Sequence, residues 1–129
     1  MPRRVRLWLA PVFCCALDAS LTLIGQPDDY WAGERDLANE ANPLARLLLL
    51  WHPLAFVAGV LAAMLFYALL LELLPRNLAR LASFGILFPH SLGVGMWCVA
   101  LFGLAGYVVA AVWLLLASWL LGWSWRGRS

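Results

Sequence analysis

Ionisable residues inside the apolar segments are the first candidates for chemistry in this chain. Asp18 lies in the first apolar segment, and His52 and His90 lie in the second and third. A carboxylate at the centre of a bilayer costs about 2.5–3.5 kcal/mol on insertion scales, so it requires a partner from protein or water. With Glu40, these residues predict one polar site, in which Asp18 and Glu40 are the acid/base groups. His52 and His90 would bind a divalent metal such as Zn, Mn or Fe there.

The spacing of the two histidines leaves other interpretations open. The sequence contains no HxxxH or HExxH pattern, so the usual helical spacing of paired metal ligands is absent. This absence favours an interpretation in which Asp18 is a structural anchor, hydrogen-bonded to His90 or to the backbone of the following loop. His52 and His90 would also suit the axial positions of a b-type haem. We expect no haem, however, because the sequence offers only one histidine pair.

The composition predicts a membrane protein. Of the 129 residues, 64% are hydrophobic and only 12% are charged, whereas soluble domains carry about 25% charged residues. The nine basic residues are all arginines, and they exceed the acidic residues by only two, which excludes a nucleic-acid-binding surface. Three cysteines in apolar segments, Cys14, Cys15 and Cys98, are predicted to be reduced thiols. The residue usage is typical of a high-GC bacterial genome, so we expect the bacterial inner membrane.

The apolar segments predict an all-α fold, a bundle of four transmembrane helices in one domain. We expect spans of about 7–24, 47–74, 81–100 and 107–123, with an acidic loop over 25–42. Gly25 suits a helix C-cap, and Asn42 followed by Pro43 is a typical helix start. Pro53 would either kink the second span or separate a short segment, residues 43–51, from it. Gly103 and Gly106 mark the predicted last turn.

The distribution of arginine distinguishes four spans from the alternative of three. Arginines stand before the first predicted span, between the second and third, and after the last, at positions 3, 4, 6, 76, 80, 126 and 128. Because such clusters favour the cytoplasmic side, four spans with both termini in the cytoplasm satisfy the rule. Three spans would leave the last cluster outside. In the four-span topology the loop over 25–42 is external, and the candidate polar residues fall in or above the outer half of the membrane.

Small residues at a spacing of four predict where the helices pack. Helix pairs in a membrane associate through close approach at small residues and through interhelical hydrogen bonds. Two rows have this spacing: Ala55, Gly59 and Ala63, and then Gly85, Pro89 and Gly93. We therefore expect buried, closely packed faces at Gly59, Gly85 and Gly93.

Part of the polar pattern resembles a known family. Asp18-x-x-x-Thr22 in the first span and Glu40-Ala-Asn42-Pro43 at the start of the second resemble an uncharacterised family of small bacterial and archaeal polytopic membrane proteins. The resemblance covers about the first third of the chain, and residues 89–97 extend the same pattern. Thr22 lies four residues after Asp18, and Asn42 approaches the same side with Glu40, so we expect both in a structural polar cluster with the carboxylates. The resemblance supports this choice of residues and names no reaction.

These features predict a small integral membrane accessory subunit or binding module with a polar cap in the outer half of the membrane. Its expected partners are the lipid bilayer and other membrane protein subunits, with no nucleic acid. One alternative is a metal-assisted hydrolase or transferase acting on a lipid or membrane-embedded substrate, with His52 and His90 as ligands and Glu40 or Asp18 as base. A second alternative is a proton or metal-ion conduit.

Overall fold

The computed structural model describes residues 5–125, and this part of the chain is helical with no β-strand. Four helices are long and apolar enough to cross a membrane, as a multi-pass membrane protein requires. They are α1 (Val5–Ile24), α4 (Pro53–Leu73), α5 (Arg76–Phe102) and α6 (Leu104–Trp125). Two short helices, α2 (Asp28–Ala32) and α3 (Pro43–Trp51), and one 3-10 turn, η1 (Arg35–Leu37), connect α1 to α4.

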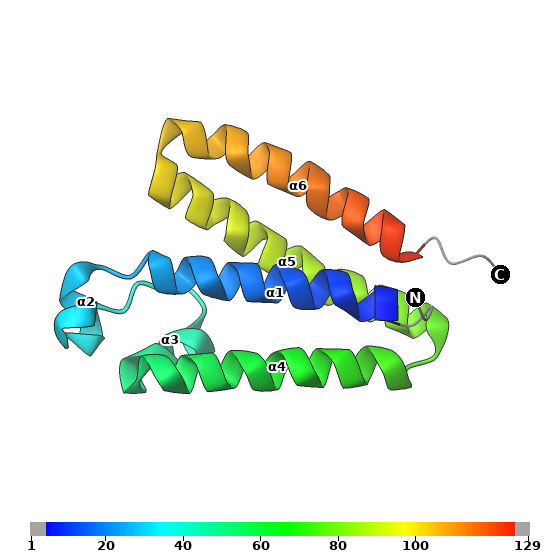
Figure 1. Cartoon of the computed structure of the whole chain (residues 1–129), viewed down its shortest axis with the longest axis horizontal. Helices are drawn as coiled ribbons and strands as arrows, with labels where there is room; N and C mark the ends of the chain where they lie inside the picture. Colours follow the sequence, from blue (N-terminus) through cyan, green and yellow to red (C-terminus); the bar gives the residue numbers. More distant parts are fainter. Residues whose placement is uncertain (1–4, 126–129) are drawn as a thin grey trace.

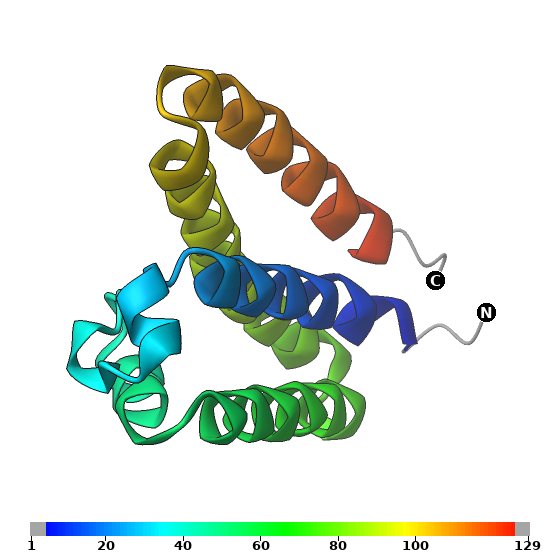
Figure 2. The ribbon, with the colours of Figure 1, turned by 60° about the vertical axis from the view of Figure 1, so that its left-hand side comes forward.

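Helix α1 is the centre of the bundle. It packs against α4, α5 and α6, while α5 and α6 form a hairpin (Figures 1 and 2). Helices α4 and α6 lie on opposite sides of α1 and α5. The segment from α2 to α3 and the α5–α6 turn lie at one end of the bundle, which we call the loop end. At the opposite end, Ser83 Oγ donates to the carbonyl of Leu7 over 3.0 Å, which joins α5 to the start of α1.

The predicted second span is divided in two. Instead of one helix over residues 47–74, α3 ends at Trp51 and α4 begins at Pro53. His52 between them is extended, with φ −168° and ψ 142°. A proline disfavours the α conformation in the residue before it and has no N–H for the preceding helix. Pro53 therefore separates the short segment from the span rather than kinking one long helix.

The last two spans are longer than predicted, and a single residue makes the turn between them. Gly103 has a φ of 57°, a conformation that residues with a side chain rarely adopt. Gly106 was expected in this turn, but it lies inside α6. Its role is close packing, since a Cβ there would collide with the carbonyl oxygen of Cys98 on α5.

The predicted packing glycines differ in what surrounds them. A Cβ at Gly93 would collide with the Asp18 carboxylate on α1. A Cβ at Gly59 would lie 2.6 Å from Leu48 of the short helix α3, so this row packs against α3. Gly85 is exposed, and a Cβ there would meet no atom within 4 Å, so the prediction of a packed face is wrong at this position. The buried face of α5 instead runs through Ala79, Ser83 and Leu87. Gly85 is two residues from Ser83, and two residues turn a helix by about 200°.

We predict that Gly106→Ala destabilises the hairpin whereas Gly85→Ala does not. The added methyl at position 106 would meet α5 backbone, and overpacking of this kind typically costs about 1–3 kcal/mol. At position 85 there is open space, and alanine is the better helix former by about 1 kcal/mol. Thermal unfolding of both variants in the same detergent compares them. Equal melting temperatures for the two variants would contradict the packing described here.

Candidate functional site

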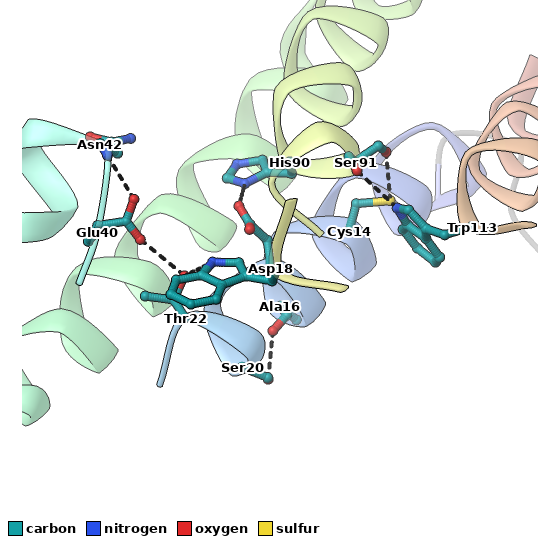
Figure 3. Close-up of polar contacts among 11 residues, drawn as sticks. Cys14, Ala16, Asp18, Ser20, Thr22, Glu40, Asn42, His90, Ser91 and Trp113 are labelled. Atoms are coloured by element: carbon teal, nitrogen blue, oxygen red, sulfur yellow. Dashed lines mark hydrogen bonds and ion pairs between the residues drawn. The ribbon is translucent and has the colours of Figure 1, made fainter. Parts of the chain in front are cut away.

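The site is built around an Asp–His pair between α1 and α5. Asp18 Oδ2 and His90 Nδ1 are 2.9 Å apart (Figure 3). The side chains of Asp18 and His90 are 21% and 23% exposed, so the pair is mostly but not completely enclosed. With Nδ1 donating to the carboxylate, the orientation of the imidazole ring is fixed.

Two glycines allow α1 and α5 to approach each other along this face. The Asp18 carboxylate lies directly against Gly93, where any Cβ would collide with it. One turn further along α5, the ring of Trp97 lies against Gly25, at the end of α1. Gly25 does not have a positive φ, so it is not a left-handed C-cap. Its lack of a side chain makes room for the indole instead.

Thr22 connects three parts of the structure. It lies one helical turn after Asp18 and is buried, with 3% of its surface exposed. Its hydroxyl accepts a hydrogen bond from Trp97 Nε1 over 3.0 Å and donates to Glu40 Oε2 over 3.1 Å. The side chain of Thr22 therefore joins α1 to α5 and to the acidic loop (Figure 3).

Glu40 and Asn42 are placed by the start of α3. The second carboxylate oxygen of Glu40 accepts a hydrogen bond from the backbone N–H of Asn42 over 2.7 Å. Asn42 in turn caps α3, because its Oδ1 accepts from the backbone N–H groups of Leu44 and Ala45. This cap is the one expected for an asparagine that precedes Pro43. The helix start thus holds Glu40 beside the end of α1.

The rest of the acidic loop is packed by two residues that the sequence analysis did not single out. Gln26 is buried, and its amide donates to the carbonyls of Thr22 and Asn39 while accepting from the N–H of Asn39. Tyr30 is fully buried and donates its hydroxyl to the carbonyl of Leu49 in α3 over 3.0 Å. A glutamine and a tyrosine just beyond an apolar segment were the available signal for these contacts. The loop is therefore a folded cap on the bundle.

Arg35 reinforces the cap at Tyr30. Its guanidinium lies 4.8 Å from the centre of the Tyr30 ring and donates to the Tyr30 carbonyl over 2.7 Å. Burial raises the pKa of the Tyr30 phenol above its ordinary value, and the positive charge of Arg35 opposes this effect. The phenol consequently stays protonated and able to donate throughout the neutral pH range.

A cavity of about 430 Å³ opens beside the Asp–His pair. One part of its wall is polar and includes both carboxylates predicted from the sequence. The polar residues are Asp18, Asn39, Glu40, Asn42 and His90. The other part consists of α5 side chains, among them Leu92, Met96 and Trp97. We call this space the polar pocket.

His52 lies outside the polar pocket, which corrects the predicted histidine pair. Its Nδ1 accepts a hydrogen bond from the backbone N–H of Leu54 over 3.1 Å and so caps the start of α4. The residue of α4 that lies near His90 is Tyr67, fifteen residues after His52. The Tyr67 and His90 ring centres are 6.0 Å apart. Fifteen helical residues span about 22 Å. His52 and His90 are thus too far apart to bind one metal ion or one haem.

No metal centre forms from the remaining candidates either. Among residues 5–125, no three His, Cys, Asp or Glu side chains are arranged so that they could hold a metal ion.

The three cysteines are free and buried, and Cys14 accepts a weak hydrogen bond from Ser91 at 3.7 Å. Trp113 of α6 donates to the carbonyl of Ser91 over 3.2 Å, so these residues hold three helices together (Figure 3).

No family model matches this chain, and the searches find no similar curated protein and no similar solved structure. The family resemblance stated above therefore stays a prediction. The site comprises an imidazole that a carboxylate orients and a second carboxylate that a loop holds. All three groups line one cavity.

We predict that Asp18 and His90 stabilise the protein as a coupled pair. Asp18→Ala and His90→Ala should each lower the free energy of unfolding, and the double variant should lose less than the sum. Polar pairs between membrane helices contribute about 0.6 kcal/mol on average, and hydrogen bonds to charged groups about 1.5–3 kcal/mol, so we expect a coupling energy of about 0.5–2 kcal/mol. Unfolding titrations in detergent measure it. Asp36→Ala, which removes an exposed acid, is the control, and strict additivity would show that the pair is not coupled.

Proposed function

We propose that this protein is a small integral membrane binding module, and that its polar pocket takes the polar group of a membrane-embedded molecule. The polar pocket carries this proposal. It combines Asp18, Glu40 and His90 on one wall with Leu92 and Met96 on the other. A cavity of about 430 Å³ lies within the usual range of small-molecule sites, about 300–1,000 Å³. Convergent polar groups beside an apolar wall are typical of such sites.

The exposure of the Asp–His pair supports binding over a purely structural role. Thr22 and Ser83, whose hydroxyls join elements through hydrogen bonds, are enclosed, at 3% and 0% exposed. Asp18 and His90 line the polar pocket, and each keeps more than a fifth of its side chain exposed. Because ionisable groups at membrane depth are costly, such exposure favours a functional site.

The charge of the polar pocket favours a ligand with hydrogen-bond donors. Asp18 and Glu40 contribute two negative charges when ionised, and His90 contributes at most one positive charge. Carboxylates accept hydrogen bonds and attract cations. We therefore expect the bound group to be an amine or a set of hydroxyls, and we expect anions to be excluded.

The position of the arginines supports an external polar pocket. Arg76 and Arg80 lie at the start of α5, at the end of the bundle opposite the loop end. The polar pocket includes Asn39, Glu40 and Asn42, which belong to the loop end. By the positive-inside rule, the end that carries these arginines faces the cytoplasm. The proposal therefore places both termini in the cytoplasm of a bacterium and the loop end in the outer half of the inner membrane. The metal-assisted hydrolase or transferase has less support, because His52 lies away from the polar pocket.

We predict that the purified protein binds octylamine and octylglycerol more tightly than octanoate, because only the first two donate hydrogen bonds to the carboxylates. Titration calorimetry in a detergent with a non-ionic headgroup measures the three affinities. Asp18→Asn should weaken octylamine binding about tenfold or more, since a hydrogen bond to a charged group contributes about 1.5–3 kcal/mol.

Asp36→Asn is the matched control, because it removes an exposed acid that does not line the polar pocket. It should bind octylamine as the wild type does. The proposal fails if octanoate binds as tightly as the amine, or if Asp18→Asn and Asp36→Asn have the same effect.

A further inference from the structure

A second cavity lies between α5 and α6. Its volume is about 500 Å³, and we call it the apolar groove. Leu92, Gly95 and Met96 of α5 and Tyr107, Ala110 and Leu114 of α6 are among the residues that line it. No charged side chain takes part in its lining. A groove of this composition offers hydrogen bonds to few polar groups and suits a hydrocarbon chain.

The floor of the apolar groove is made by small residues. A Cβ added to Gly95 would lie 3.6 Å from the Cβ of Ala110, which is ordinary van der Waals contact. Gly95 and Ala110 are both small, so little side-chain volume fills the space between α5 and α6 here. The larger side chains of Leu92, Tyr107 and Leu114 form the sides.

The apolar groove adjoins the polar pocket. Leu92, Met96 and Ala100 line both cavities, and their spacing of four places them in one stripe along α5. Met96, in the middle of this stripe, is 65% exposed. Its side chain is unbranched and adapts readily to neighbouring groups, so it is a weak barrier between the two spaces.

We infer that the apolar groove takes the hydrocarbon chain of the same molecule whose polar group occupies the polar pocket. This inference rests on the proposed function, and it narrows the ligand to a single-chain amino or hydroxy lipid. The polar group would lie between Asp18, Glu40 and His90. The chain would cross the stripe at Met96 and continue between α5 and α6. Two adjoining cavities, one lined by acceptors and one by hydrocarbon, match the two ends of such an amphiphile.

Photo-crosslinking tests the position of the chain. The probe is octadecylamine with a diazirine in the middle of its chain, added to the full-length protein in lipid nanodiscs. We expect crosslinks in peptides from residues 92–114. Excess unlabelled octadecylamine should abolish these crosslinks, because both molecules compete for the polar pocket. Crosslinks spread evenly over all four long helices, and insensitive to the competitor, would overturn the inference.

Variants that fill the apolar groove provide the second arm. Ala110→Trp should abolish the crosslinks in residues 92–114 and leave the binding of octylamine unchanged, because the short chain does not need the groove. Val112→Trp is the control, since Val112 is 61% exposed on α6 and does not line the groove. If Ala110→Trp does not fold, Leu114→Trp tests the same point from the end of the groove.

The outcomes separate the inference from the proposed function. If octylamine binds but Ala110→Trp and Leu114→Trp crosslink as the wild type does, the chain lies elsewhere and only the inference is wrong. If neither octylamine nor octylglycerol binds to the wild type, the proposed function fails, and the inference fails with it.

Discussion

A carboxylate in hydrocarbon requires a partner, and the structure depends on how this requirement is met for Asp18. The partner is His90, 2.9 Å away on a helix that is distant in sequence. To reach it, α1 and α5 must lie close together, which explains why Gly93 and Gly25 face Asp18 and Trp97. Polar contacts between membrane helices contribute little individually, but leaving such a group without a partner is costly. The pair therefore selects one register of α1 against α5.

Hydrogen bonds connect the acidic loop to this helix pair. Thr22 of α1 donates to Glu40, Glu40 accepts from the backbone N–H of Asn42, and Asn42 caps the start of α3. Buried Gln26 and Tyr30 close the cap over the bundle. The folded cap holds the second carboxylate in the wall of the same pocket as the first, in spite of their like charge, and the polar pocket lies between the cap and α5. The folded loop is thus a wall of the site.

Hydrophobic length and composition sufficed to predict four membrane-spanning helices, because both are local properties of the sequence. The cap formed by Asn42 before Pro43 is local too. The rotation of a helix about its axis is not a local property of the sequence. Gly85 shows the consequence, because it has the spacing of a packing glycine but lies on the exposed side of α5. His52 and His90 are equivalent as residue types, whereas Pro53 makes the first a helix cap. The sequence predicts a cap at Gly25 and not its contact with Trp97, because Trp97 lies seventy-two residues away in sequence.

Nitrogen-15 NMR of the histidine-labelled protein in lipid bilayers tests the central pair most directly, since the chain contains only two histidines. The account predicts that Nδ1 of His90 carries a proton in a strong hydrogen bond and that its resonance shifts in Asp18→Asn but not in Asp36→Asn. The resonances of His52 should be the same in all three proteins. If the His90 resonances were also unchanged in Asp18→Asn, the carboxylate and the imidazole would not be partners in the membrane, and the site described here would not exist.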